Sequence, residues 1–124
     1  MRIKTEIITD IDVDKILAKR GLGPSNEAER ALAVTVKDLM DPYTPFRGGT
    51  LKNDAQVIVE SDGVYIVYDQ PYAHYQYEGV SHSGKPLKYH DAPTRGKHWD
   101  KRMMADKGDE VTKWFADYVG GKVK

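Results

Sequence analysis

The sequence predicts a single α+β domain, in which a central antiparallel hairpin or sheet is packed by one helix from the N-terminal half and one C-terminal helix. Three observations predict this class. Two β-rich runs flank an Asp-Gly step near the middle of the chain, which is a strong hairpin signal. Apolar residues recur at intervals of three or four on both sides of that hairpin, as in amphipathic helices. The length of 124 residues fits one core.

Residues 1–10 are expected to form a loosely held strand or arm. Their isoleucines are spaced too irregularly to separate strand from helix, although β-branching favours a short strand. These are Ile3, Ile7 and Ile8, followed by Ile11. Asp12 is the expected N-cap of a short helix over residues 13–20, with Gly21 as its stop. The beginning of the chain therefore predicts an extended segment followed by a short helix.

A longer helix is expected over residues 28–40. Its apolar positions recur every three or four residues, and Ser25 or Asn26 is positioned to cap it. Pro42 ends it, because proline cannot continue a helix. The following stretch, up to Gly49, holds two prolines and two glycines, so it is predicted to be a loop.

Residues 55–60 and 64–69 are the predicted strands of the hairpin, with Ser61, Asp62 and Gly63 between them. Alternation predicts two faces. One holds Val57, Val59, Tyr65 and Val67, and the other holds Ile58, Val64, Ile66 and Tyr68. Both sets are apolar, so the hairpin is expected to be central and covered by helices.

The C-terminal half begins with Pro71, which breaks the strand, and one helical turn over residues 72–77 ahead of Gly79. Residues 86–89 are the next strand-like piece. A closing helical region is predicted over residues 99–119, open to interruption at Gly108. Its apolar stripe is Val111, Trp114, Phe115, Tyr118 and Val119. Residues 120–124 are expected to fray.

Composition excludes several classes of protein. The chain has no cysteine, so no disulfide framework, thiolate metal site or thiol nucleophile is available. Nineteen basic side chains balance nineteen acidic ones, which is not the charge of a dedicated nucleic-acid binder. We find no apolar run near the roughly 20 residues that span a bilayer, and no signal-peptide core. A cytoplasmic address without a membrane partner is the expectation.

One segment nearly matches a phosphate-binding loop. Gly79, Gly84 and Lys85 have the spacing of that motif. Pro86, however, stands where the motif needs the hydroxyl that holds magnesium. A surface loop is the preferred interpretation, and no cofactor is expected.

The four histidines invite a metal or acid–base hypothesis, because imidazole titrates near neutral pH and binds metals. They are His74, His82, His90 and His98. None lies in a His-Glu-x-x-His motif. Nuclease-like groups would be His90 with Asp91 and Arg95, or His98 with Asp100 and Lys101. Adjacency is not geometry, so no catalytic or metal-binding residue is assigned.

The later third of the chain is locally basic, with aromatic residues between the charges. Such residues contact phosphate backbones. They are Lys85, Lys88, Arg95, Lys97, Lys101 and Arg102, beside Tyr89 and Trp99. A solvated helix face is favoured over DNA binding of physiological strength, so at most weak, non-specific DNA contact is expected.

Tyrosines gather in the middle of the chain, where they are either core residues or anchors of a protein interface. Tyr65 or Tyr68 is assigned to the core. Tyr75 and Tyr77, near Gly79, are better interface candidates, and Phe46, Arg47 and Tyr89 join them as candidate interface residues.

The order of three blocks resembles the minor capsid proteins of tailed bacteriophages, grouped with the small head–tail connector and tail-completion proteins. The first block runs from Tyr43 through Pro45, Gly48 and Gly49 to Leu51 and Lys52, ahead of the hairpin. The second is Pro71-Tyr72-Ala73 with Gly79, and the third is a terminal helix led by Trp99. The resemblance covers residues 17–118. At Arg47-Gly48 relatives more often carry an acidic residue and Thr.

The resemblance implies a structural, non-enzymatic protein acting at the head–tail junction or in tail completion. It implies oligomerisation, in a ring, and docking to neighbouring neck or tail proteins. A ring would need two complementary surfaces on each subunit, and we expect the loop over residues 43–52 to be one and the segment over residues 75–89 to be the other. The expected location is the virion, and the host cytoplasm during assembly. The alternatives are a small nucleic-acid-binding adaptor and a metal- or histidine-dependent hydrolase using the segment from His82 to His98.

Overall fold

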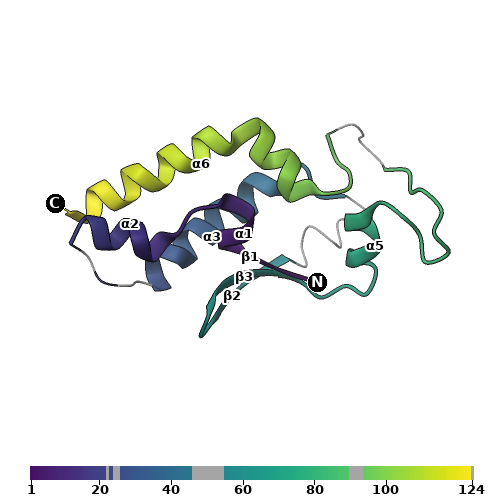
Figure 1. Ribbon diagram of the computed structural model, residues 1–124. Helices are drawn as coiled ribbons and strands as arrows, with labels where there is room; N and C mark the ends of the chain where they lie inside the picture. The colour runs from purple at the N-terminus through teal and green to yellow at the C-terminus, as the bar shows by residue number, and fades with distance from the viewer. Residues whose placement is uncertain (22, 24–25, 46–54, 90–93, 124) are drawn as a thin grey trace.

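The computed structural model describes residues 1–21, 23, 26–45, 55–89 and 94–123, apart from the side chains of 121–123. Helices lie against a three-stranded antiparallel sheet of order β1-β3-β2 (Figure 1), which confirms the predicted α+β class. The elements are β1 (Arg2–Lys4), α1 (Thr5–Thr9), α2 (Val13–Lys19), α3 (Asn26–Met40), β2 (Ala55–Glu60), β3 (Gly63–Tyr68), α5 (Ala73–Glu78) and α6 (Trp99–Val123).

The predicted hairpin is confirmed, but its predicted faces are wrong. Glu60 pairs with Gly63 across a two-residue turn, so Val57 lies opposite Ile66 and Ile58 lies opposite Tyr65. The expected grouping treated Gly63 as part of a three-residue turn. Because side chains alternate along a strand, a shift of one residue in register exchanges the faces of one strand relative to the other. One face therefore holds Ala55, Val57, Val59, Val64, Ile66 and Tyr68, and the other holds Gln56, Ile58, Glu60, Tyr65 and Val67.

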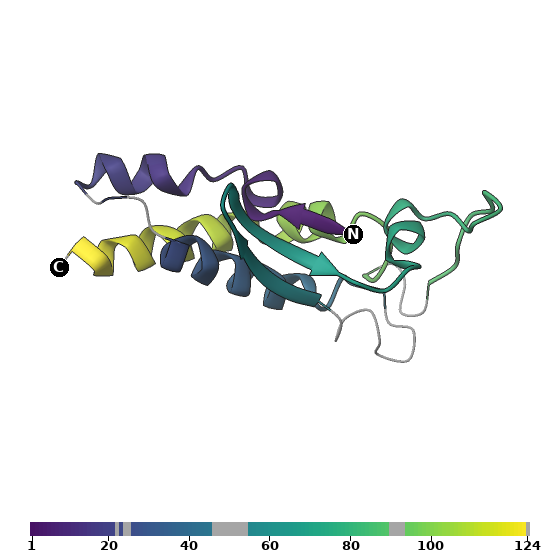
Figure 2. The same ribbon diagram turned by 90° about the horizontal axis from the view of Figure 1, so that it is seen from below.

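Within the described residues, helices cover one face of the sheet and not the other, which corrects the expectation that both apolar faces are covered. Figure 2 shows α3 and α6 passing behind the strands, with the second face turned toward the viewer. On the covered face, Val64, Ile66 and Tyr68 are fully buried. On the open face, the Arg2 guanidinium lies 4.1 Å from the centre of the Tyr65 ring and 2.9 Å from Glu60. The apolar residues of this face are thus screened by charged neighbours instead of a helix.

The core lies between the sheet, α3 and α6. Leu32, Ala33, Val36 and Met40 of α3 meet the buried face of β3, and α6 contributes Trp99, Met103, Val111, Phe115 and Val119. Of the predicted apolar stripe on α6, Trp114 and Tyr118 are half-buried and the other three are in the core. The helix runs on through Gly108, although glycine costs about 1 kcal/mol relative to alanine there.

The irregular isoleucines are explained by a strand that turns into a helix. β1 adds an edge to the sheet, pairing Ile3 with Ile66, and α1 begins at the next residue after Lys4. Ile8 is buried, whereas Ile7 is 74% exposed. Neither a period of two nor one of 3.6 fits both segments together.

Two predicted helix signals are confirmed. The carboxylate of Asp12 accepts a hydrogen bond from the backbone N–H of Lys15, 3.1 Å away, and so caps α2. Gly79 ends α5 in the left-handed region, with φ of 81°. A Cβ at Gly79 would lie 2.7 Å from Cδ of Lys97, so both the backbone and the neighbouring side chain require glycine.

Candidate functional site

Trp99 joins the sheet to α5 at the start of α6. Its indole N–H donates to the hydroxyl of Tyr68, 3.1 Å away, and its ring meets those of Tyr68 and Tyr77 edge-on at centroid distances of 5.4 and 5.1 Å. Such edge-to-face contacts add to the energy of burial. Burial also raises the pKa of Tyr68 to about 12. Trp99, predicted as a structural motif residue, lies at the centre of this aromatic junction.

Tyr77 is part of the same junction. Its hydroxyl donates to Oδ1 of Asp100, 2.7 Å away, and its backbone carbonyl accepts from the N–H of His98 at 3.0 Å. Burial and the Asp100 carboxylate both raise the pKa of Tyr77. The residue was proposed as an interface tyrosine, and the structure also gives it an internal role: it locks α5 to the N-terminal turn of α6.

The base of the predicted 43–52 loop is held by contacts with distant parts of the chain. Tyr43 is buried, and its hydroxyl donates to Asp106 on α6 at 2.8 Å. The guanidinium of Arg95 donates to the carbonyls of Asp41 and Thr44. Pro45 is buried. Phe46, Arg47, Gly48, Gly49 and Leu51 lie outside the described residues, so their predicted motif and interface roles stay predictions.

Helix α5 has a groove on each side. One side presents His74, Tyr77 and Glu78, and the other presents Tyr72, Tyr75 and Gln76. Residues three and four apart share a face of a helix, so these two sets point in different directions. The helix follows Pro71, which is exposed, and begins at Ala73, which is fully buried. The Pro71-Tyr72-Ala73 motif thus fixes α5 by its buried alanine and leaves both flanks available.

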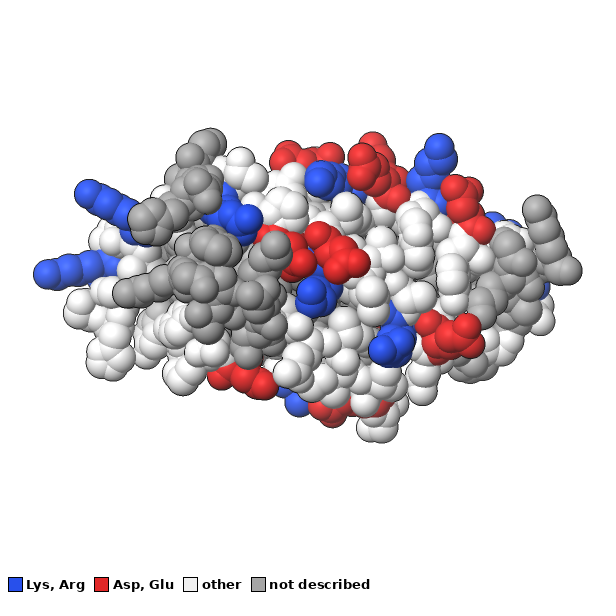
Figure 3. All heavy atoms as spheres, turned by 180° about the vertical axis from the view of Figure 1, so that it is seen from behind, with Lys and Arg blue, Asp and Glu red and all other residues white. Residues whose placement is uncertain are grey.

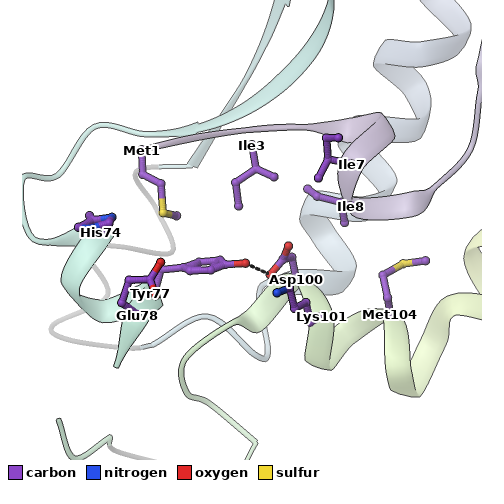
Figure 4. Close-up of a pocket in the computed structure, with 10 residues that line it drawn as sticks. All are labelled: Met1, Ile3, Ile7, Ile8, His74, Tyr77, Glu78, Asp100, Lys101 and Met104. Carbon is purple, nitrogen blue, oxygen red and sulfur yellow. Dashed lines mark hydrogen bonds between the residues drawn. The ribbon is translucent and has the colours of Figure 1, made fainter. Parts of the chain in front are cut away.

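The larger hollow, here called the β1 groove, has a volume of about 560 Å³ and lies between β1, α1, α5 and α6. Figure 4 shows Met1 and Ile3 on one side, facing Tyr77 and Asp100 on the other. The walls also include Ile7, Ile8 and Met104, and the polar residues are His74, Glu78, Asp100 and Lys101. An apolar hollow with a few polar groups is typical of a binding surface.

The smaller hollow, here called the arm groove, has a volume of about 360 Å³ and separates α5 from the segment over residues 80–89, called the arm. Tyr75 lines it, and its ring lies 5.8 Å from that of His82. Tyr89 anchors the arm, since its hydroxyl donates to the carbonyl of Gln76 at 2.6 Å. Of the three candidate interface tyrosines described, Tyr75 and Tyr77 thus line different grooves and Tyr89 fixes the arm.

The near match to a phosphate-binding loop folds as a turn within the arm. Val80 forms a bridge with Pro86, and the N–H of Ser81 donates to the carbonyl of Lys85 at 2.7 Å. The segment follows the C-terminal end of α5, and no helix begins between it and residue 89. It therefore lacks the helix N-terminus that holds phosphate in such motifs.

The described histidines line different surfaces, although His74 and His82 both lie against the ring of Tyr75. His74 lines the β1 groove and His82 the arm groove, while Nε2 of His98 lies 3.8 Å from Glu78. Within the described residues, no three histidine, aspartate or glutamate side chains gather as metal ligands would. His90 and Asp91 lie outside the described part of the chain.

Two of the basic residues of the later third are held by contacts within the molecule. Arg95 is engaged with the base of the loop, and Lys97 packs against Gly79. Lys85, Lys88 and Lys101 are exposed. Figure 3 shows basic and acidic side chains interspersed over one face of the molecule.

Sequence reasoning missed most of the β1 groove. Met1, Ile7 and Met104 carry no motif, and they are brought together only when β1, α1 and α6 fold against one another. The available signal was Ile7, the isoleucine that fits neither neighbouring element. Exposed apolar residues mark a partner surface where they are contiguous, as Ile7 is with Ile3 and Met104 in the lining of this groove.

A family model described as "Minor capsid protein" matches residues 7–121. The chain therefore belongs to the minor capsid protein family of bacteriophages, and its role is that of a structural protein of the virion. No curated protein matches the chain. No solved structure matches it either. Among the described residues, no helix is both long and apolar enough to cross a membrane.

Proposed function

We propose that this minor capsid protein acts at the head–tail junction or in tail completion, by contacts between its own copies and by docking onto neighbouring neck or tail proteins. The work is structural and involves no turnover. In this proposal the protein assembles in the host cytoplasm and makes at most weak, non-specific contact with DNA. The observation that carries the proposal is the pair of grooves on the two sides of α5.

A ring needs two different surfaces on each subunit, because its contacts are heterologous. The β1 groove and the arm groove differ in lining and direction, which supports such an arrangement. Between them, α5 is locked by Tyr77 and Trp99, with the Tyr77 hydroxyl 2.7 Å from Asp100. Rigid surfaces lose little conformational entropy on binding, so this locking favours assembly.

The direct test is electron microscopy of the lysate from a phage lacking this gene, with the gene supplied in trans. Separate filled heads and free tails, or tails with abnormal ends, are the expected result. Normally joined virions in the absence of the gene would contradict the proposal.

Single substitutions then test whether the grooves are needed for the proposed role in the virion. Ile7→Glu places a charge in the β1 groove at a side chain that is 74% exposed, so we expect a folded protein that fails to restore infectious phage. Ala18→Glu adds the same charge at an exposed position of α2, which does not line the groove. It should complement normally. Equal complementation by both variants would remove the β1 groove from the proposal.

Tyr75→Ala tests the arm groove in the same assay. Its ring contacts are with His74 and His82, both exposed, so the variant should fold and lose assembly. Tyr77 is a poorer choice, because its loss would also break the lock with Asp100.

A further inference from the structure

The outer edge of β2 is free within the described residues. In the order β1-β3-β2, β2 is an end strand. Met1 and Tyr68 exchange backbone hydrogen bonds of 2.8 and 2.7 Å, so the polar groups of Tyr68 point toward β1. Those of its neighbour Val67 point toward β2, because backbone groups alternate along a strand. Val67 pairs with Gln56, and Ala55, Val57 and Val59 therefore point their N–H and C=O groups outward.

The described part of this edge lacks several features by which proteins usually prevent strand pairing. Such features are lysine, proline, a bulge or a very short strand. β2 is six residues long with the sequence AQVIVE, and Val59 is 42% exposed. The opposite edge is better protected, because β1 is three residues long, carries Arg2 and Lys4, and turns directly into α1.

We propose that the free protein pairs with a second copy of itself through β2, in antiparallel orientation about a two-fold axis. The outward N–H and C=O groups of Val57 then form hydrogen bonds with those of Val59 of the second copy. By the two-fold symmetry, Val59 pairs in the same way with Val57 of the second copy. This register places Ile58 opposite Ile58 of the second copy at the axis. It joins two three-stranded sheets into one continuous sheet.

The side chains of β2 are self-complementary in this register. Gln56 lies opposite Glu60 of the second copy, where its amide can donate to a carboxylate that already lies 2.9 Å from Arg2. Val57 and Val59 meet on the other face, beside the helices. A register shifted by two residues toward the start of the strand would instead set Gln56 against Ile58. Matched cross-strand pairs stabilise a sheet and mismatched pairs do not.

Helix α3 supports the added strand. It packs against β2 and β3 and, in Figure 2, extends behind β2 past its open edge. This helix also carries Val34, which is 37% exposed. The inference goes beyond the proposed function, because it concerns the protein before it joins the virion and holds for any position there.

The first test measures the mass of the purified full chain by analytical ultracentrifugation, from micromolar to millimolar concentration. We expect a mass near twice 14.0 kDa. Val59→Pro removes an N–H that faces outward, where proline is tolerated, and should raise the dissociation constant about tenfold or more. Val59→Thr keeps both the N–H and the β-branching and should pair like the wild type. Circular dichroism confirms that each variant is folded.

The second test uses the absence of cysteine from the natural chain. Ile58→Cys places a single thiol at the two-fold axis, in a pair whose Cα atoms approach within about 4.5 Å, which suits a disulfide. Val67→Cys is the matched control, because it lies on the same face of the sheet but on the central strand. Rapid oxidation of only the first variant to a covalent dimer is expected. A wild type of 14.0 kDa at every concentration, or equal oxidation of both variants, would overturn the proposal.

Discussion

The base of the 43–52 loop and the arm are both tyrosine-bearing turn segments, yet they are held in different ways. Tyr43 bonds to Asp106, 63 residues away, whereas Tyr89 bonds to Gln76, 13 residues away. The base of the loop is attached to α6 through Tyr43. It is also attached, through Arg95, to the segment that comes directly before α6. The arm bonds to itself and to α5. The first set of contacts should contribute to global stability, and the second should open locally without unfolding the domain.

Trp99 offers the largest test of this comparison, because it supports Tyr68 in the sheet and Tyr77 in α5 together. Trp99→Ala should lower the free energy of unfolding by about 3–5 kcal/mol, the usual cost of emptying a large buried aromatic site. Urea denaturation followed by fluorescence of Trp114 measures the effect. A loss below about 1 kcal/mol would mean that the aromatic junction is not central to the fold.

High pH should weaken the same junction. The pKa of Tyr68 is about 12 in the folded protein against 10.0 when unfolded, so the native state retains a proton that the unfolded state releases. Stability is therefore full below pH 10 and falls as pH rises toward 12. Two pKa units correspond to about 2–3 kcal/mol. Thermal melts across this range should show the decline, and Tyr68→Phe should make it shallower, while the raised pKa of Tyr77 accounts for part of what remains.

The two anchoring hydroxyls make a matched pair for testing the comparison directly. Tyr43→Phe should lower global stability by about 1 kcal/mol, the usual net value of a hydrogen bond. Tyr89→Phe removes the 2.6 Å bond to Gln76, and we expect faster amide exchange in the arm with little change in the global melting temperature. Equal losses of global stability in both variants would erase the distinction between the segments.

Gly108→Ala should give the smallest change, and it should be stabilising. Gly108 lies within the continuous α6, where alanine is favoured by about 0.5–1 kcal/mol. A Cβ there would lie 3.5 Å from Cε of Met104, an ordinary contact. Chemical denaturation should report the gain, and amide exchange in the arm should be unchanged because Gly108 is not part of the bonds that hold the arm. Destabilisation would mean that the glycine itself is needed.

Local signals predicted most of the elements. Asp12, Gly79 and the Asp-Gly step act within one turn of chain, so the sequence alone predicts their effects on α2, α5 and the hairpin. The pairing of the hairpin faces could not be predicted in the same way, because it depends on whether Gly63 belongs to the turn or to β3. Both choices give two apolar faces, and only packing against α3 and α6 separates them.

The residues of the candidate site likewise fall into those that local sequence predicts and those that depend on distant contacts. Tyr75 and Tyr77 were predicted from residue type and from their position ahead of Gly79, and both line grooves. Met104 could not be predicted, because nothing in its local sequence indicates that α1 and α6 meet. The hydroxyl bond from Tyr77 to Asp100 likewise joins residues 23 apart.

The two-residue turn of the hairpin also limits how this gene can vary in length. Insertion of one residue at Ser61 or Asp62 would have to be absorbed by a three-residue turn with a bulge, because a shift in pairing instead would turn Val64, Ile66 and Tyr68 out of the core. Insertions in the arm carry no such penalty, because its position does not set the alternation of any core strand. Among natural variants we therefore expect length differences to accumulate in the arm and to be rare in the hairpin turn.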